Sequence, residues 1–230
     1  MNKAIKDQVG DWFPILGPLL AGEDFAKVRE QLKNLKKSFQ AYYPTQGNTF
    51  KAFKMTQRKD LKIVIITDEP YCDGTASGLA LARPQNCKVY PEIQLFSDKL
   101  EADYKMIVLD FDRSLEHWAK QGILLLNAAL SVQRDKPGSH KDLWRPITLK
   151  LIEELSKKRN DLIFVLMTPT VEEFRQKIMG KSVVLTGFNP GEINTTLKLQ
   201  GKSEINWMDL PEGGHGMWDR ILREDIECPF

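Results

Sequence analysis

Residues 61–72 read LKIVIITDEPYC, a short apolar run that passes directly into a polar loop. Three later segments repeat this pattern: 123–127 (ILLLN), 162–169 (LIFVLMTP) and 183–190 (VVLTGFNP). Runs that are apolar on both faces and separated by helical stretches are typical of buried parallel strands. The sequence therefore predicts an α/β fold with three layers, α/β/α, around a central four-stranded, mostly parallel sheet.

Each of these runs leads into a residue that can take part in chemistry. Ligands of open α/β sheets bind beyond the carboxyl ends of the strands. The residues found there are Glu69, Asn127, Thr168 and Asn189. We therefore expect the functional site to be built from these four side chains.

Two other segments differ in regularity. Residues 12–20 are apolar but contain Pro14, Gly17 and Pro18, which predicts an irregular N-terminal segment. In residues 140–158, apolar side chains recur at helical spacing, which predicts the longest helix of the chain.

Length and composition indicate the number of domains and the net charge. The chain has 230 residues, 42% of them hydrophobic, and is long enough to bury one large core, so we expect residues 1–230 to form a single domain. Lys and Arg number 33 and Asp and Glu number 31, a net charge of +2. The chain therefore lacks the overall basic field of a nucleic-acid coat protein, and contact with nucleic acid has to come from local patches.

The cysteines indicate the cellular compartment of the protein, and the histidines indicate whether it binds a metal. Cys72, Cys87 and Cys228 are an odd number of cysteines in a sequence without a signal peptide, which indicates a reducing compartment. No apolar run approaches the roughly 20 residues needed to span a bilayer. We expect a protein of the cytoplasm, or of the nucleus in a eukaryotic host, without membrane contact. The three histidines form no cluster at ligand spacing, so we expect no metal and no other cofactor.

Several stretches match one family pattern. They are Glu69-Pro70-Tyr71 with Gly78-Leu79-Ala80, residues 118–132, Gly138-Ser139-His140-Lys141 with Trp144 and Thr148, residues 187–193, and Ile205-Asn206-Trp207-Met208. On these stretches the chain resembles the family-1 uracil-DNA glycosylases, the enzymes that excise uracil from DNA. The resemblance spans most of the chain from the first predicted strand onward. It implies a hydrolase of base excision repair with this α/β fold.

The resemblance implies roles for five side chains of a base pocket. Glu69 falls where the family has its water-activating carboxylate, which holds a water and stabilises the positive charge that develops on the sugar. Asn189 falls where the family has a histidine that donates to O2 of the departing base. Asn127 pairs with N3–H and O4 of uracil, Tyr71 leaves no room for the thymine methyl, and Leu81 stands where the base stacks on phenylalanine.

The partner implied is DNA, single- or double-stranded, with a flipped pyrimidine, bound by a monomer. Ser139, Thr168 and Gly191 are expected to contact the DNA backbone. The branched side chain of Ile193 is expected to enter the duplex and hold the gap left by the flipped nucleotide.

The chain also departs from the family pattern around this pocket. Glu69 stands where the family usually has Asp, and the extra methylene displaces the carboxylate by roughly 1 Å, enough to cost on the order of 10²-fold in rate if nothing compensates. The other replacements are Asn189 for histidine, Leu81 for phenylalanine, Cys72 for histidine and Thr168-Pro169 for a Gly-Ser phosphate clamp.

Three functions remain open on the sequence. The first is an active glycosylase, of normal or reduced rate, that excises uracil or a related pyrimidine, which retention of Tyr71 and Asn127 favours. The second is a non-catalytic DNA-binding or replication-accessory relative, and the third is a viral enzyme acting on a modified pyrimidine. Simpler interpretations also stay open for single residues: a capping carboxylate for Glu69, turn residues for Asn127 and Asn189, and a core position for Ile193.

Overall fold

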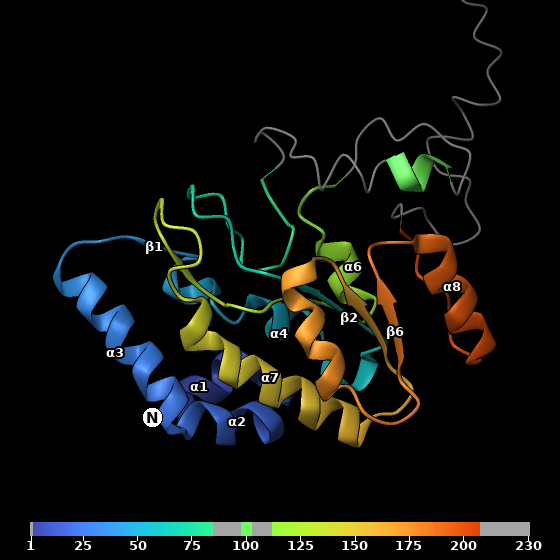
Figure 1. Ribbon diagram of the computed structural model, residues 1–230, viewed down its shortest axis with the longest axis horizontal. Coiled ribbons are helices and arrows are strands. Elements are labelled where there is room, and N and C mark those ends of the chain that lie inside the picture. Colours follow the sequence, from blue (N-terminus) through green and yellow to red (C-terminus); the bar gives the residue numbers. More distant parts are fainter. Residues whose placement is uncertain (1, 85–97, 103–111, 208–230) are drawn as a thin grey trace, which may run out of the picture.

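The central sheet has four strands, and all of them are parallel (Figure 1). In this computed structural model the described residues are 2–84, 98–102 and 112–207, so Cys87, Cys228 and Met208 lie outside them. The strands are β2 (Ile63–Thr67), β3 (Ile123–Asn127), β5 (Ile163–Leu166) and β6 (Val183–Thr186), in the order β3-β2-β5-β6. The four apolar runs of the sequence are these strands, so that prediction is confirmed.

The order of the strands explains the layers. The connection from β2 to β3 and the connection from β3 to β5 run in opposite directions across the sheet. Because crossovers between parallel strands are right-handed, these two connections lie on opposite faces. The helix α6 (Glu116–Lys120) therefore covers one face and α7 (Lys141–Lys158) the other, which gives the predicted α/β/α arrangement.

The remaining helices complete the two outer layers. On the α7 side, α2 and α3 pack against α7, and the 3₁₀ segment η4 packs beside it (Figure 1). On the other side, α4 and α6 contact each other and β3. Among the described residues the further bounds are α1 (Asn2–Val9), η1 (Gly10–Trp12), α2 (Phe13–Ala21), α3 (Glu23–Lys37), η2 (Gln46–Asn48), α4 (Lys51–Met55), η3 (Arg58–Asp60), η4 (Pro169–Lys177) and α8 (Pro190–Leu199).

The expectation of an irregular segment at residues 12–20 was wrong, because most of it is the helix α2. Pro14 lies in the first turn, where a backbone N–H has no partner inside the helix and its absence costs nothing. Pro18 does remove a bond, but Leu16 and Leu20 are buried in the core and α2 packs on α7. Burial of this apolar face offsets the lost hydrogen bond.

A second, very small sheet joins two loops near the carboxyl edge of the main sheet. The strands β1 (Tyr42–Tyr43) and β4 (Val132–Gln133) pair in antiparallel register. Two-residue strands carry no periodicity that a sequence can reveal. This pairing holds the loop that follows β4, which the site uses.

Candidate active site

The four expected positions all lie at the carboxyl edge of the sheet. Asn127 is the last residue of β3, and Glu69, Thr168 and Asn189 follow β2, β5 and β6 within three residues. Glu69 and Asn127 thus stand at the same end of neighbouring strands, as the sequence predicted.

The loops beyond β2 and β3 are bonded to each other. Thr67 is paired with Asn127 in the parallel register. The N–H of Ala128 donates to Thr67 O at 2.8 Å, and the N–H of Ala129 donates to Asp68 O at 2.9 Å. The first residues after the two strands therefore keep a defined separation.

The carboxylate of Glu69 is half-buried and is held by a backbone amide. The N–H of Gly138 donates to both carboxylate oxygens, at 2.7 Å to Oε1 and 2.9 Å to Oε2. Burial raises the pKa of the Glu69 carboxyl above its ordinary value; the Gly138 bond opposes this shift, Asp68 adds to it and Lys141 opposes it. The arrangement holds a desolvated carboxylate with one dedicated donor.

Asn127 is the most buried polar residue of the four. Its side chain is 5% exposed, and its Oδ1 accepts a hydrogen bond from the Thr67 hydroxyl at 2.6 Å. An amide oxygen has two acceptor positions, so one remains, together with the two N–H donors of Nδ2. The bond to Thr67 orients the amide and leaves it able to pair with one donor and one acceptor of a ligand.

Tyr71 is clamped from two sides. The guanidinium of Arg83 lies over its ring at 3.8 Å from the ring centre, and its hydroxyl donates to Leu81 O at 3.4 Å. Arg83 is itself 3% exposed and forms an ion pair with Asp73 at 2.7 Å. Burial alone would raise the pKa of Asp73, but hydrogen bonds from Thr75 and Arg83 lower it to about 2.

Asn189 begins the helix α8. Its Oδ1 accepts from the N–H of Glu192 at 3.1 Å, which is an N-cap bond, and the side chain is exposed. The residue before it, Phe188, is buried and stacks on Trp118 at 5.4 Å between ring centres. The cap uses one of the two acceptor positions of Oδ1 and leaves both Nδ2 donors of Asn189 for a ligand.

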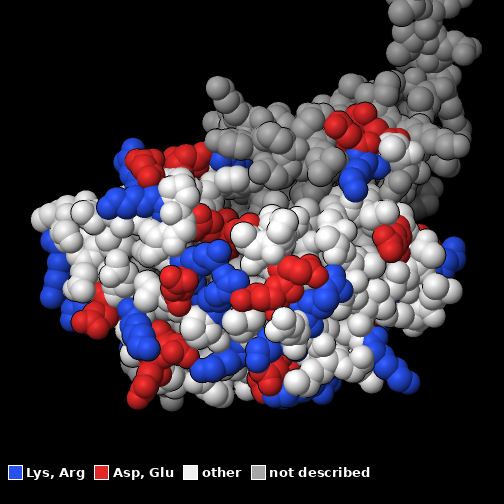
Figure 2. Space-filling model, in the orientation of Figure 1, with Lys and Arg blue, Asp and Glu red and all other residues white. Residues whose placement is uncertain are grey.

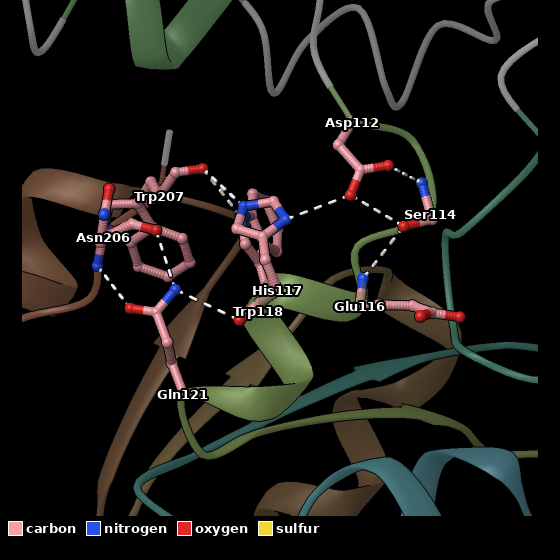
Figure 3. A network of polar contacts seen from close by, with 8 residues as sticks. All are labelled: Asp112, Ser114, Glu116, His117, Trp118, Gln121, Asn206 and Trp207. Atoms are coloured by element: carbon pink, nitrogen blue, oxygen red, sulfur yellow. Dashed lines mark hydrogen bonds and ion pairs between the residues drawn. The ribbon is translucent and has the colours of Figure 1, made fainter. Parts of the chain in front are cut away.

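The ring of Trp207 packs against both Trp118 and Phe188. Polar contacts from α6 and Gln121 hold Asn206 and Trp207 in place (Figure 3). Trp118 Nε1 donates to Trp207 O at 2.9 Å, and His117 Nε2 lies 3.0 Å from the same oxygen. Gln121 binds the other residue twice, because its Nε2 donates to Asn206 O at 2.9 Å and its Oε1 accepts from Asn206 N–H at 2.7 Å. Two residues of α6 and Gln121, which follows the helix, thus anchor Asn206 and Trp207. Trp207 in turn packs on Phe188, the residue before Asn189.

Comparison with known proteins decides the family. No protein-family model matches the chain. A uracil-DNA glycosylase of Coxiella burnetii (strain RSA 493 / Nine Mile phase I) is 31% identical over 221 residues, which cover 94% of this chain and 96% of that protein. This chain belongs to the uracil-DNA glycosylase family.

A second relative agrees with this assignment, and a solved structure shows the same fold. A uracil-DNA glycosylase of Dichelobacter nodosus (strain VCS1703A) is 30% identical over 213 residues, covering 85% of this chain and 93% of that protein. The crystal structure of mimivirus uracil-DNA glycosylase superposes with a TM-score of 0.79 at 20% identity, covering 89% of this chain and 92% of that one. The mimivirus structure confirms the uracil-DNA glycosylase fold.

At Thr168, where the resemblance led us to expect contact with the DNA backbone, the hydroxyls are already engaged. Thr168 Oγ1 lies 2.9 Å from Thr170 Oγ1, and the Thr170 hydroxyl donates to the carboxylate of Asp68. A phosphate placed at Thr168 would therefore meet a nearby negative charge. This network was not expected from the sequence.

The other expected DNA-contacting residues differ in exposure. Ser139 is exposed, and its Oγ accepts from the N–H of Gln133 at 2.8 Å. Gly191 lies in the first turn of α8 and is partly exposed. Both positions lie in loops or helix starts at the carboxyl edge of the sheet, where a DNA backbone could reach them.

The expectation that Ile193 inserts into DNA was wrong for this structure. Its side chain is 0% exposed and belongs to the hydrophobic core. Ile193 lies on the inner face of α8, where it is buried together with Pro190, Asn194 and Leu197 at helical spacing. Of the two interpretations that the sequence left open, the core position is the one the structure supports.

Three residues of the site were missed on the sequence: Thr67, Arg83 and Gly138. Arg83 carried a weak signal, since it is a charged residue that follows the apolar run 79–82. Gly138 belongs to a stretch that matches the family pattern, but nothing in the sequence linked its amide to Glu69. Thr67 carried no signal, because a threonine at a strand end is common.

The surface agrees with the small net charge. Figure 2 shows basic and acidic side chains interspersed over the face in view rather than gathered by sign. Within the described part of the chain, no helix is long and apolar enough to cross a membrane. In the same residues, no three His, Cys, Asp or Glu side chains lie close enough together to hold a metal ion.

Proposed function

We propose that this protein is a DNA glycosylase that flips uracil, or a related pyrimidine, out of DNA and hydrolyses its N-glycosidic bond. Membership of the uracil-DNA glycosylase family supports this proposal. One observation carries it. A half-buried carboxylate, Glu69, and an oriented amide, Asn127, lie beyond the same ends of two adjacent strands.

Base identity would be set by Asn127. Uracil presents N3–H as a donor and O4 as an acceptor, and an amide held in one orientation pairs with both. Cytosine has an acceptor at N3 and a donor at N4, so the same amide would leave both groups mismatched, which is costly in a buried site. The bond from Thr67 supports this role because it favours one orientation of the amide.

Tyr71 and Leu81 would shape the rest of the pocket. A ring beside the C5 edge excludes the thymine methyl only if the ring cannot move aside. The Arg83 guanidinium over one face of Tyr71 and the hydroxyl bond to Leu81 O restrict the ring in this way. Leu81 would then contact the base with aliphatic surface in place of an aromatic stack.

Cleavage would depend on charge rather than on a covalent intermediate. As the sugar–base bond breaks, positive charge develops on the sugar and negative charge on the base. The Glu69 carboxylate would stabilise the first and hold the attacking water, and the Nδ2 donors of Asn189 would stabilise the second at O2. The cap bond to Oδ1 orients the Asn189 amide and leaves its Nδ2 donors available to a ligand.

Contact with DNA would be weak and sensitive to salt. Backbone amides near Ser139, Thr168 and Gly191, with a few Lys and Arg, would bind phosphates, while Asp68 would repel them. A dissociation constant measured at low and moderate salt should rise with salt, and one that stays constant would contradict this contact mode. We further propose that the protein acts as a monomer in the cytoplasm, or in the nucleus of a eukaryotic host.

The test is base release from defined substrates. The protein is incubated with single-stranded oligonucleotides that carry uracil, thymine or modified pyrimidines, and abasic sites are then cleaved with alkali. Strand breaks at uracil or at a modified pyrimidine, formed far more slowly with Glu69→Gln, are the expected result. A parent protein that forms no breaks at any of these bases would contradict the proposal.

One observation favours a second candidate, a DNA-binding relative without glycosylase chemistry. The Thr168–Thr170–Asp68 network ties up the hydroxyls at the clamp position and adds a carboxylate there. In an enzyme that binds the phosphates beside the target nucleotide, a carboxylate at this position would repel them. Binding to uracil-containing DNA without release of any base would favour this candidate.

A further inference from the structure

The carboxylate of Glu69 has a partner that comes from far away in the chain. Gly138, 69 residues later, lies in the loop between β4 and α7, and its N–H points at both carboxylate oxygens. A single donor shared by the two oxygens aligns the carboxylate with the N–H direction. Each oxygen keeps lone pairs for other groups.

The loop that carries Gly138 is itself restrained. The N–H of Asp135 donates to Cys72 O at 3.1 Å, which ties the loop to the residues that follow Glu69. The N–H of Arg134 donates to Ala41 O at 2.9 Å, next to β1. Gly138 has a φ of +75°, a conformation that L side chains rarely adopt. The bonds that hold this loop do not involve the side chain at position 69, so we expect the amide to keep its place when that side chain changes.

A fixed donor makes the length of the side chain at position 69 decisive. With glutamate, the oxygens lie 2.7 and 2.9 Å from Gly138 N. Aspartate, which is the family's usual residue here, is one methylene shorter and would withdraw its oxygens by roughly 1 Å. Distances near 3.7 Å are outside hydrogen-bond range.

We infer that Gly138 is a positioning residue that adapts this site to glutamate, because its backbone amide fixes the Glu69 carboxylate where the water and the developing sugar cation meet it. This inference rests on the proposed glycosylase function and deepens it. The Gly138 amide then compensates for the extra methylene of Glu69, and the loss of rate expected from a displaced carboxylate does not arise.

The first test is the change toward the family's residue. Glu69→Asp should lower the single-turnover rate of uracil release by about 10²-fold, since the carboxylate loses its donor and its position. The loss should appear in kcat with little change in KM. A Glu69→Asp enzyme as fast as the parent, or faster, would overturn the inference.

The second test uses two matched glycines. Gly138→Ala and Gly201→Ala both place a methyl group on a residue with positive φ, +75° and +68°, and in neither case does any atom lie within 4 Å of the added carbon. Both variants should lose similar stability in urea denaturation. Only Gly138→Ala should also lower the rate, by about tenfold or more, while Gly201→Ala stays within about twofold of the parent. Equal rates in the two variants would overturn the inference.

The double variant Glu69→Asp/Gly138→Ala separates a shared role from two unrelated ones. If the two residues act together, the double variant should be about as slow as Glu69→Asp alone. Multiplied losses would mean that they act independently.

A direct readout of the contact does not need catalysis. The chemical shift of the Gly138 amide should change with pH as Glu69 ionises, and this step should be missing in Glu69→Gln. If the parent releases uracil but the chemical shift of the Gly138 amide does not change as Glu69 ionises, the inference is overturned and the proposed function is not. A parent that releases no base overturns the proposed function, and with it the catalytic purpose of the contact, even if the amide titrates.

Discussion

The two halves of the site use their polar atoms differently. In the half built on β2 and β3, Glu69 and Asn127 each have one dedicated partner, the Gly138 N–H and the Thr67 hydroxyl. In the half built on β5 and β6, Thr168 is tied through Thr170 to Asp68, and the Asn189 oxygen caps α8. The bonds of the first half orient a carboxylate and an amide. In the second half, the side chains of Thr168, Thr170 and Asn189 form hydrogen bonds with neighbouring parts of the chain instead. Base recognition should therefore be more sensitive to mutation than phosphate or leaving-group contacts.

The largest effect is expected in the first half. Glu69→Gln keeps the shape of the side chain but removes the charge that stabilises the sugar cation. We expect the rate of uracil release to fall by on the order of 10²–10⁴-fold, measured in single turnover. If Glu69→Gln retained the parent's rate, the β2–β3 half would not be the catalytic half.

The next effect tests recognition in the same half. Asn127→Asp should weaken action on uracil by roughly 10- to 10²-fold and admit cytosine, because a protonated carboxyl donates to N3 while its other oxygen accepts from the exocyclic amine. Rates on uracil and cytosine oligonucleotides measure the change. The matched control is Asn160→Asp, an exposed amide between α7 and β5, at the opposite edge of the sheet, which should leave both rates unchanged.

A smaller effect is expected in the second half. Asn189→His restores the family's donor over O2 and should raise the rate, by up to about tenfold. The same change removes an N-cap and should lower the free energy of unfolding by about 1 kcal/mol. Asn189→Ala loses both the donor and the cap and serves as the control. A rate that does not respond to histidine would mark Asn189 as a turn residue, with the base stabilised elsewhere.

The smallest effect is on stability and follows from the raised pKa of Glu69. Between the ordinary carboxyl pKa of 4.5 and the raised value, the folded state binds more protons than the unfolded state. Stability from this group is therefore lost as the pH rises through that window. Glu69→Gln should gain stability over the parent across the same window and keep that gain at higher pH. Urea denaturation of both proteins from pH 4 to pH 8 measures the difference, and a gain that shrinks with rising pH would contradict the buried-carboxylate account.

The sequence by itself determined the sheet and the place of the site. The runs 63–66 and 123–126 are apolar on both faces, short and rich in branched side chains, which is typical of a buried parallel strand. Because the residues that follow such strands must all appear at one edge, Glu69, Asn127, Thr168 and Asn189 could be placed there before any contact was known. The stretch 118–132 likewise carried the resemblance to the family that comparison with the Coxiella protein confirms.

The tertiary structure alone decided how each of these residues is used. Ile193 is core because α8 packs the face that carries Ile193 and Leu197 against the rest of the molecule. Residues 12–20 form a helix because α7 offers them a surface to bury against. The partners of Glu69 and Tyr71, Gly138 and Arg83, are set by where separate loops meet, and a loop carries no periodicity that records its neighbours. Local pattern predicts elements and their ends, whereas a contact between loops depends on the packing of the whole chain.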